Sequence, residues 1–305
     1  MLPAVIAVVG ATATGKSDLA VDLAGALGGQ VVNADSMQLY RGMDIGTAKL
    51  TLTERRGIPH HLLDVWPVTQ TATAAAYQSL ARSVIDALLA AGVTPVLVGG
   101  SGLYLRAALD ALTFPGTDPQ LRADLEAELA AGGSPALHAR LAGLDPAAAA
   151  RMEPTNGRRV VRALEVLLLT GLMPGQLTSY DAHYPTAYLG LDRPDLAART
   201  DARVDRMWVQ GLVQEVRTLS EQGLRDGVTA SRALGYAQVL AMLAGDLDEP
   251  TARELTKTAT RRFARRQRAW FRRDPRIRWL DPRADPAADL LTEALRALTP
   301  VPSSL

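Results

Sequence analysis

The chain has 305 residues, of which 48% are hydrophobic, so it can form one large domain or two smaller ones around a sizeable core. It contains no cysteine, which excludes disulfides, thiol nucleophiles and cysteine-ligated metal sites and favours a reducing cytoplasm. The formal net charge of +1 hides an asymmetry, because residues 251–281 carry 11 basic side chains against three acidic ones.

The N-terminal region shows neither the basic segment nor the long apolar segment of a signal peptide. No apolar stretch in the chain approaches the roughly 20 residues that a membrane-spanning helix needs. We therefore expect a cytoplasmic protein with no membrane partner.

The first 110 residues alternate between short apolar runs and helical patterns. The runs predict strands, and the segments between them predict helices, over these ranges: strands 5–9, 30–36, 60–66 and 95–100, and helices 16–27 and 73–91. Apolar runs that are separated by helices are typical of a parallel sheet covered on both faces. The pattern thus predicts an α/β fold.

The pattern changes after about residue 118, where Ala, Leu, Glu and Arg dominate and β-branched runs are few. Helices are predicted at 119–132, 146–152 and 156–171. Further on, the pattern predicts strands at 187–192 and 276–281 and helices near 195–222, 232–244, 250–273 and up to about 297. We predict a core domain from residues 1–116 and 187–305, with an all-helical insertion at 117–186.

The segment GATATGKS, residues 10–17, fits the phosphate-binding loop pattern G-x-x-x-x-G-K-[ST] at every fixed position. Gly10 and Gly15 permit a tight turn whose backbone N–H groups converge on phosphate oxygens. The following helix adds the positive end of its dipole, Lys16 can reach a terminal phosphate, and the Ser17 hydroxyl can bind Mg²⁺. The loop alone does not indicate which phosphate compound it holds.

Asp35 follows the second predicted strand, at the edge of a parallel sheet where ligands bind. A carboxylate at this position can bind Mg²⁺ through water or accept a proton from a nucleophile. A helix cap or a turn aspartate is an equally good interpretation of the position alone.

The basic segment places Arg261, Arg265, Arg268 and Arg272 at intervals of i, i+4, i+7 and i+11, which is one stripe of a helix. Such a stripe can contact successive phosphates of a nucleic acid. A solvated helix face is the alternative interpretation.

Taken together, the motifs resemble those of one family, the tRNA dimethylallyltransferases, also called tRNA isopentenyltransferases. The matching blocks follow in the same order over nearly the whole chain: GATATGKS, DSMQLYRGMDIGTAK (35–49), PHHLLD (59–64), VGGSGLYLRA (98–107), NGRRVVRALEV (156–166), RVDRM (203–207), LGYAQ (234–238) and RRFARRQRAWFRR (261–273). The loop departs slightly from the family pattern, with Ala11 for proline and Thr14 for serine. Ser101 replaces a threonine, and Gly157 stands where the family often has Asp or Pro.

The resemblance implies a P-loop NTPase-like core with an inserted helical subdomain. It also implies transfer of a dimethylallyl group from dimethylallyl diphosphate to N6 of an adenine. In the family this adenine lies on the 3′ side of the anticodon, in tRNAs that read codons beginning with U. The expected partners are therefore the tRNA anticodon stem-loop and the diphosphate, the expected cofactor is Mg²⁺ bound by Ser17, and we expect a monomer.

The resemblance also assigns residues to roles. Asp35 is expected to be the general base, with Thr14 and Arg203 as further catalytic residues. Diphosphate binding falls to Gly10, Ala11, Thr12, Ala13, Thr14, Gly15, Lys16 and Ser17. Binding of tRNA falls to Asp35, Ser36, Met37, Gln38, Ser101, Arg122, Arg158, Arg159, Val160, Val161, Arg162, Arg232, Arg261, Arg265 and Arg268. Without the family, salt bridges from the 158–162 arginines to Glu165 or Glu153 would be the favoured interpretation.

Three alternatives share parts of this pattern. A phosphate-loop kinase would use Lys16, Ser17 and Asp35 with ATP, although it leaves the basic helix without a purpose. An adenylate isopentenyltransferase would use free AMP, ADP or ATP as the acceptor. A non-catalytic RNA-binding module would bind tRNA and leave dimethylallyl diphosphate unconsumed.

Overall fold

The structure is a computed structural model that describes residues 4–171, 179–281 and 290–298. The chain forms two compact units, one from residues 1–111 and 181–305 and the other from residues 112–180. The sequence pattern predicted the insertion at 117–186, so both of its observed ends, at 112 and 180, lie earlier in the chain. The segments on either side of the insertion pair with each other inside the first unit. Asp110 and Ala182 form an antiparallel bridge, and Ala111 N–H donates to the Asp181 carbonyl at 2.8 Å.

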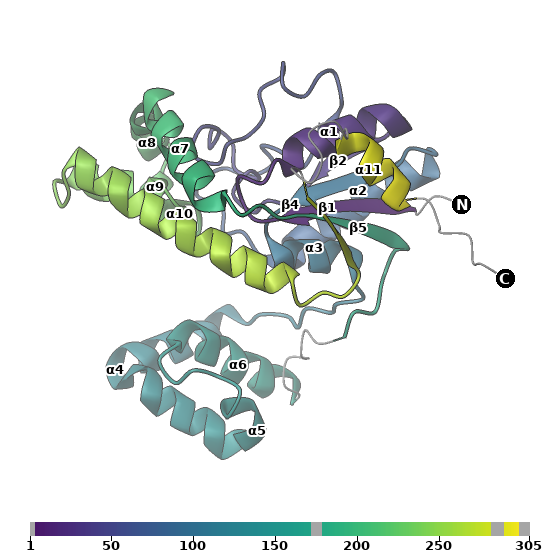
Figure 1. Cartoon of the computed structure of the whole chain (residues 1–305). Helices are drawn as coiled ribbons and strands as arrows, with labels where there is room; N and C mark the ends of the chain where they lie inside the picture. The colour runs from purple at the N-terminus through teal and green to yellow at the C-terminus, as the bar shows by residue number, and fades with distance from the viewer. Residues whose placement is uncertain (1–3, 172–178, 282–289, 299–305) are drawn as a thin grey trace. The chain divides into compact units, whose positions relative to one another are not determined.

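A sheet of six parallel strands forms the centre of the first unit, in the order β3-β2-β4-β1-β5-β6 (Figure 1). The strands are β1 (Val5–Gly10), β2 (Gln30–Asn33), β3 (His60–His61), β4 (Pro95–Gly99), β5 (Thr186–Leu191) and β6 (Ile277–Leu280). This confirms the predicted α/β class. The strand predicted at 60–66 is only two residues long, because positive φ angles at Leu62 and Asp64 turn the chain out of the sheet.

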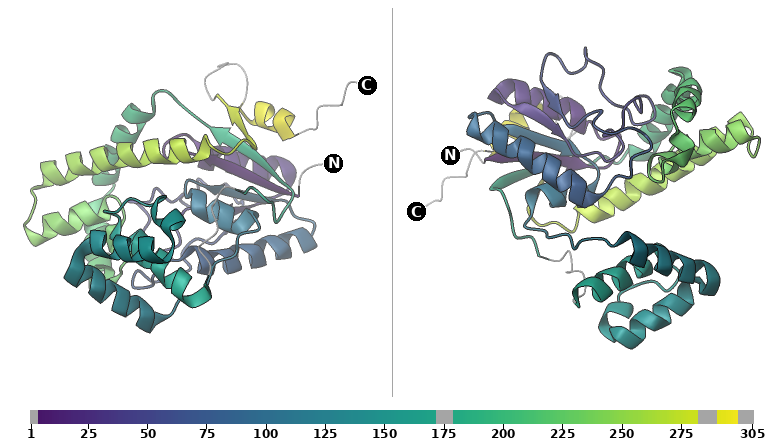
Figure 2. Two further views of the ribbon diagram at one scale, coloured as in Figure 1. Left: turned by 90° about the horizontal axis from the view of Figure 1, so that it is seen from below. Right: turned by 180° about the vertical axis from the view of Figure 1, so that it is seen from behind.

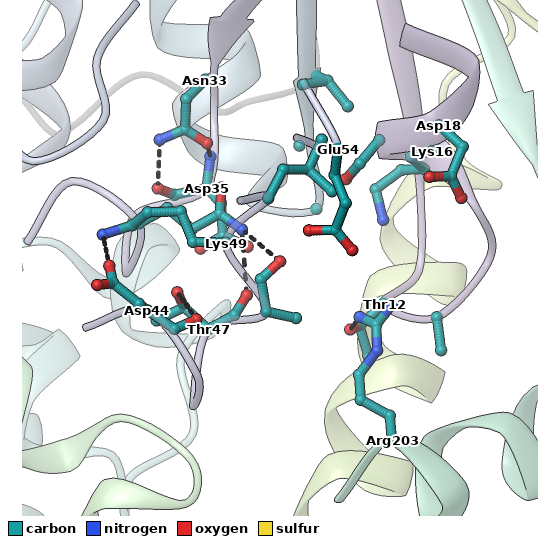
Figure 3. Close-up of a pocket in the computed structure, with 18 of the residues that line it drawn as sticks. Thr12, Lys16, Asp18, Asn33, Asp35, Asp44, Thr47, Lys49, Glu54 and Arg203 are labelled. Atoms are coloured by element: carbon teal, nitrogen blue, oxygen red, sulfur yellow. Dashed lines mark hydrogen bonds and ion pairs between the residues drawn. The ribbon is translucent and has the colours of Figure 1, made fainter. Parts of the chain in front are cut away.

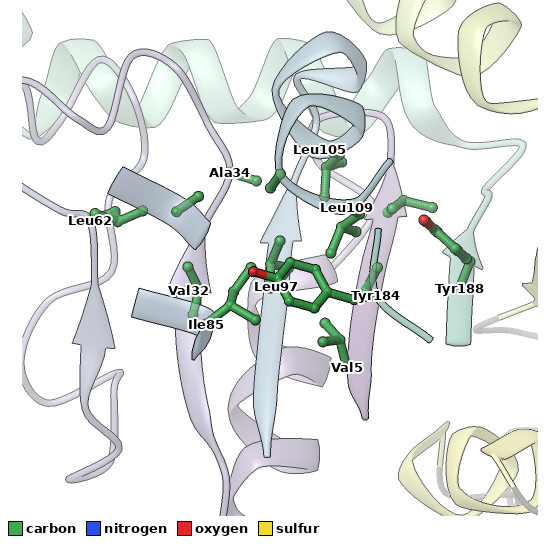
Figure 4. Close-up of a cluster of buried hydrophobic side chains, with 14 of the residues drawn as sticks. Val5, Val32, Ala34, Leu62, Ile85, Leu97, Leu105, Leu109, Tyr184 and Tyr188 are labelled. Atoms are coloured by element: carbon green, nitrogen blue, oxygen red, sulfur yellow. The ribbon is translucent and has the colours of Figure 1, made fainter. Parts of the chain in front are cut away.

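Helices cover both faces of the sheet. The β1 side chains alternate, so that Val5, Ala7 and Val9 pack on one face while Ile6 and Val8 pack on the other. Figure 4 shows Val5 among the buried side chains of the first face. Helices α2 (Ala74–Ala90) and α3 (Gly102–Leu109) cover the first face, and α1 (Lys16–Leu27) and α11 (Leu290–Leu298) cover the second. The sequence pattern did not predict α3.

Further helices of the first unit lie beside the sheet and share their own buried cluster with the loop after β2. They are α7 (Leu196–Val209), α8 (Leu212–Glu221), α9 (Tyr236–Ala244) and α10 (Glu249–Phe271), with short 3₁₀ turns at Leu224–Asp226 and Ala230–Arg232. The helix predicted at 195–222 is two helices, because Gly211 adopts a φ of 101° between them. Helix α10 runs alongside α7 and α9 (Figure 2).

The second unit consists of α4 (Pro119–Leu144), α5 (Pro146–Ala149) and α6 (Gly157–Thr170) around a small apolar core. Helix α4 is broken at Gly133, where φ is 75°, and Pro135 then starts its second half. The sequence pattern predicted only the first half.

Within the described parts of the chain, every helix is too short or too polar to cross a membrane.

Candidate active site

A cavity of about 500 Å³ opens in the first unit, at the carboxyl ends of its strands. It is lined by the phosphate-binding loop, the end of β2, the loop over residues 44–54, the turn after β4, and side chains of α7 and α10. In Figure 3, Lys16 and Asp18 come from one side of this cavity, Asp35 and Asp44 from another, and Arg203 from below. These segments meet because parallel strands all end at the same edge of a sheet.

The phosphate-binding loop has the backbone that its glycines predict. Gly10 has a φ of 142°, and a Cβ there would overlap the carbonyl oxygen of Leu191 in β5. Ala13 also adopts a positive φ, of 66°, and its carbonyl accepts a 2.8 Å hydrogen bond from Arg199 Nε in α7. Thus α7 stabilises a loop conformation that a non-glycine residue adopts at a cost.

The two threonines of the loop differ in their surroundings. Thr12 lines the cavity, and its Oγ1 accepts a 2.9 Å hydrogen bond from Arg203 Nη1. Thr14 is buried, with 1% of its surface exposed, and its hydroxyl donates to the Ala11 carbonyl at 2.9 Å. In this structure the Thr14 hydroxyl thus holds the loop together, and the role of Thr14 in catalysis and diphosphate binding stays a prediction.

Three charged groups face the cavity and perturb one another. Burial lowers the pKa of Lys16 to about 7, with a further decrease from Arg203 and an opposing increase from Asp35. Burial likewise raises the pKa of Asp35, against lowering contributions from backbone hydrogen bonds and from Lys16 and Arg203. Burial and the neighbouring charges of Arg206 and Arg199 lower the pKa of Arg203. Such perturbed groups in one cavity are typical of a functional site.

A buried asparagine fixes the position of Asp35. Asn33 is 2% exposed; its amide donates to the carbonyls of Asp35 at 3.0 Å and Leu62 at 2.9 Å, and its oxygen accepts from Asp35 N–H at 2.9 Å. One Asp35 carboxylate oxygen accepts from Met37 N–H at 2.9 Å. Asp35 thus makes the local contact expected of a turn aspartate and also faces the cavity, so the two interpretations of its position are compatible.

The loop over residues 44–49 is held from below by Glu215 of α8. Its carboxylate accepts from three consecutive backbone N–H groups, those of Asp44, Ile45 and Gly46, at 2.7–3.2 Å, and from the Tyr236 hydroxyl at 2.6 Å. The ammonium group of Lys49 is buried and contacts two carboxylates, of Asp44 and Asp64, at 2.6 Å each. The loop belongs to the matching block DSMQLYRGMDIGTAK and was therefore expected to be functional. Glu215 lies outside every matching block, so the sequence did not predict its contact with the loop.

The residues that were expected to face the acceptor lie next to Asp35. Ser36 N–H donates to Ser101 Oγ at 3.3 Å, which joins the segment after β2 to the turn after β4. The Gln38 amide lines the cavity and donates to the Thr47 carbonyl at 3.1 Å. Met37 is partly buried against the second apolar cluster of the unit.

In the second unit, the predicted tRNA-binding residues have different environments. Arg158 and Arg159 are exposed on α6. Val160 and Val161 are 0% and 3% exposed and belong to the core of the unit, so their side chains pack inside it and cannot contact RNA. The latter two assignments are corrected.

Arg122 and Arg162 both contact the carboxylate of Glu165, which is fully buried. The salt-bridge interpretation predicted the Arg162 contact but did not include Arg122. Arg162 also donates to the carbonyls of Pro115 at 2.8 Å and Gly116 at 3.1 Å. These contacts join the start of the unit to α6. The two arginine side chains remain about one third exposed.

The predicted arginine stripe on α10 is largely engaged in ion pairs. Arg261 contacts Asp201 at 2.7 Å, and Arg268 and Arg272 both contact Asp192 at 2.8 Å. Most of the stripe therefore attaches α10 to α7 and to the end of β5, while its contacts with RNA phosphates stay a prediction. Arg265 is exposed, as are Arg262 and Arg266 of the same helix and Arg232 of a 3₁₀ turn.

The structure brings to the cavity three further side chains that carried no predicted role, those of Arg206, Gln210 and Gln267, although Arg206 and Gln267 lie within the matching sequence blocks. Arg199 and Arg206 lie on α7 one turn before and one turn after Arg203, and Arg206 and Gln210 line the cavity. Gln267 of α10 reaches the phosphate-binding loop. The i, i+4, i+7 spacing of the three α7 arginines was visible in the sequence, whereas nothing in it related Gln267 to residue 12.

The model of the IPP transferase family matches residues 38–274. The chain is 64% identical over 278 residues to a tRNA dimethylallyltransferase of Parafrankia sp. (strain EAN1pec), covering 91% of this chain and 87% of the relative. It is 65% identical over 284 residues to one from Thermobifida fusca (strain YX), covering 90% and 89%.

Comparison with solved structures indicates the same family. A full-length tRNA isopentenylpyrophosphate transferase from Bacillus halodurans superposes with a TM-score of 0.71 at 38% identity and 96% coverage of each chain. A eukaryotic dimethylallyltransferase acting on tRNA gives a TM-score of 0.77 at 29% identity, covering 91% of this chain and 73% of the other. The P-loop NTPase-like fold predicted from the resemblance is thereby confirmed, and the chain belongs to the IPP transferase family.

Proposed function

We propose that the chain is a tRNA dimethylallyltransferase that modifies N6 of the adenine next to the anticodon, on its 3′ side, in tRNAs reading codons that begin with U. The observation that carries the proposal is one cavity that combines a phosphate-binding loop with the partly buried carboxylate of Asp35. Family membership supports the same activity. We expect the enzyme to act as a cytoplasmic monomer.

At C1 of the dimethylallyl group the reaction forms one bond and breaks one, and a proton moves from N6 to a base. The N6 nitrogen attacks C1 of the dimethylallyl group, the bond from C1 to the diphosphate oxygen breaks, and its electron pair leaves with the diphosphate. N6 must also lose a proton, which Asp35 is placed to accept. The raised pKa of Asp35 makes it a stronger base than an ordinary carboxylate, provided that the pH is high enough for it to be ionised.

Negative charge develops on the departing oxygen, so cations fixed beforehand lower the barrier. Lys16 and Arg203 both line the cavity next to the loop. Their hydrogen bonds to the Ala11 carbonyl at 2.6 Å and the Thr12 hydroxyl at 2.9 Å hold them there. They need little reorganisation when the diphosphate binds.

The residues present fit a Mg²⁺ ion, which prefers oxygen ligands. Ser17 lies in the first turn of α1 and lines the cavity, as do Asp18, Asp35 and Glu54. The Ser17 hydroxyl would hold the ion, with carboxylates nearby to bind its water molecules. When bound, Mg²⁺ would supply positive charge to the diphosphate.

One assay separates the proposed function from its alternatives. The chain is incubated with labelled dimethylallyl diphosphate, Mg²⁺ and one of three acceptors: unmodified tRNA, AMP or ATP. We expect label in the tRNA only. Label in AMP or ATP would indicate an adenylate isopentenyltransferase, and unconsumed diphosphate with intact tRNA binding would indicate a non-catalytic module.

The Asp35→Asn variant tests the base. We expect its single-turnover rate to fall by about 10²- to 10⁴-fold, the usual contribution of a general base, while tRNA and diphosphate binding persist. Asp246→Asn removes an exposed carboxylate outside the cavity and serves as the charge-matched control. A near-normal single-turnover rate in Asp35→Asn would refute this role for Asp35.

The exposed arginines of α10 and α6 are candidates for contacts with RNA phosphates. Replacing both Arg262 and Arg265 with Ala should raise the KM for tRNA. It should also make the plot of log KM against log salt concentration less steep, by the amount expected for the loss of about two phosphate contacts. The KM for dimethylallyl diphosphate should not change. An unaltered salt dependence would exclude this surface as an RNA contact.

A further inference from the structure

Gln267 is a buried polar side chain that joins two separate segments of the active site. It lies in α10 and is 6% exposed. Its Oε1 accepts a 2.8 Å hydrogen bond from Thr12 N–H in the phosphate-binding loop. Its Nε2 donates at 2.9 Å to the carbonyl of Gly100 in the turn after β4.

The surroundings of this side chain are closely packed. A Cβ on Gly100 would overlap Gln267 Nε2, so the turn approaches the amide as only glycine can. One turn earlier in α10, Ala264 packs against Ala11 and Ala13 of the loop. The helix thus contacts the phosphate-binding loop through a small residue and an amide.

Helix α10 itself is attached firmly enough to serve as a support. Arg261 is paired with Asp201 of α7, and Arg268, next to Gln267, is paired with Asp192 at the end of β5. The position of the Gln267 amide is therefore determined by a long helix that is anchored on both sides of it.

The two segments joined by Gln267 belong to different substrates under the proposed function. Thr12 lies in the loop for the diphosphate and holds Arg203. Gly100 precedes Ser101, whose hydroxyl accepts from Ser36 N–H, next to Asp35. The amide is thus a direct hydrogen-bonded link between the leaving-group side and the acceptor side.

We propose that Gln267 is a positioning residue that sets the separation between the phosphate-binding loop and the acceptor-binding segment. This inference rests on the proposed function. Bond formation requires the reacting atoms to lie about 3–3.5 Å apart, and a displacement of about 1 Å can reduce the rate about 10²-fold. Loss of the link should therefore affect the chemical step more than the binding of either substrate.

The first test is Gln267→Met, which has a similar length but no amide. We expect the single-turnover rate at saturating substrates to fall about 10- to 100-fold, while the dissociation constants of pyrophosphate and tRNA change less than about threefold. Gln238→Met is the matched control, because Gln238 is a helical glutamine that caps α9 through the Gly235 N–H and does not line the cavity. An unchanged single-turnover rate in Gln267→Met would overturn the proposal. So would a loss of substrate affinity as large as the loss in rate.

The second test is Gln267→Glu, which gives a readout that a general loss of stability would not produce. An ionised carboxylate can accept from Thr12 N–H but repels the Gly100 carbonyl, whereas a protonated one can also donate to it. The rate of this variant relative to the original chain should therefore rise as the pH is lowered. A pH-independent ratio would contradict the proposed link.

A third measurement does not depend on activity. Gln267→Met should accelerate hydrogen exchange at the Thr12 amide, because its acceptor is lost. If the original chain transfers no label to tRNA, the proposed function fails, whatever the exchange result. If the chain is active but exchange at Thr12 is unchanged in the variant, the link through Gln267 fails on its own.

Discussion

The lowered pKa of Lys16 predicts that diphosphate binding weakens as the pH rises above neutrality. Desolvation and the nearby charge of Arg203 lower the pKa of the Lys16 ammonium group to about 7, whereas an ordinary lysine keeps its proton to above pH 10. Only the charged form attracts the diphosphate. In the free chain, raising the pH from 6 to 9 therefore removes the charge on which binding depends.

The magnitude follows from the pKa of about 7. About nine tenths of Lys16 is charged at pH 6, about one tenth at pH 8 and about one hundredth at pH 9. The association constant should therefore fall about tenfold per pH unit above pH 7, which corresponds to about 1.4 kcal/mol per unit. Binding at pH 8 should also take up nearly one proton.

Titration calorimetry with inorganic pyrophosphate and EDTA measures both quantities, in buffers with different ionisation enthalpies. Pyrophosphate itself titrates in this range, so each constant is divided by that of Lys16→Arg, whose guanidinium stays charged. We expect this ratio to be level below pH 7 and to fall above it. Asp35→Asn should move the break to lower pH, since Asp35 raises the pKa of Lys16.

A ratio that stays level from pH 6 to pH 9, with no proton uptake at pH 8, would refute the reasoning. It would show that Lys16 keeps its proton in the free chain despite its burial, or that its charge does not contribute to diphosphate binding.

Three other substitutions test parts of the structure that support the site. Glu165→Gln should destabilise the helical unit by about 2–3 kcal/mol, because it leaves two guanidinium groups without their buried carboxylate; faster hydrogen exchange confined to residues 112–180 would confirm this. Burial raises the pKa of Glu165, but Arg122 and Arg162 lower it by more, so the pKa of Glu165 lies below its usual 4.5. The carboxylate therefore stabilises the unit at neutral pH, and this stabilisation is lost as the pH falls below about 4.5. A pH-independent effect of the substitution would contradict the pairing. Asn33→Ala should cost about 1–3 kcal/mol in urea unfolding and reduce turnover by misplacing Asp35, and normal turnover would contradict that support. Gly46→Ala should lower the Tm, because its Cβ would overlap the ring of Tyr236; an unchanged Tm would show that the loop shifts freely.

Much of the fold could be predicted because its signals are local. The helix from Lys16 to Leu27 matched its predicted bounds, since a glycine lies at each end. The predictions of element bounds failed where contacts with distant residues or single backbone angles determine where an element begins or ends. The strand after Pro59 stops at His61 because two residues adopt positive φ, and α3 begins directly after the glycine turn that ends β4.

Some residues of the site could be predicted from local sequence and others could not, for the same reason. Asp35 and Lys16 reach one cavity, because strand ends and a loop motif determine where they lie. The tRNA contacts stay predictions, and the structure changes how they are distributed. Arg261 and Arg268 looked like a phosphate-binding row, but their partners Asp201 and Asp192 are about 60 to 76 residues away and are not visible in a helical pattern.

By itself, the sequence determined the family, the α/β class and the loop that holds phosphate, because each depends on short segments whose residue types dictate their conformation. Only the tertiary structure decided how those segments are supported. It turned the Thr14 hydroxyl inward, shifted the pKa of Lys16 by burial, and placed Gln267 between Thr12 and Gly100. Burial and hydrogen bonding between distant residues arise only when the chain packs, so no local pattern could encode them.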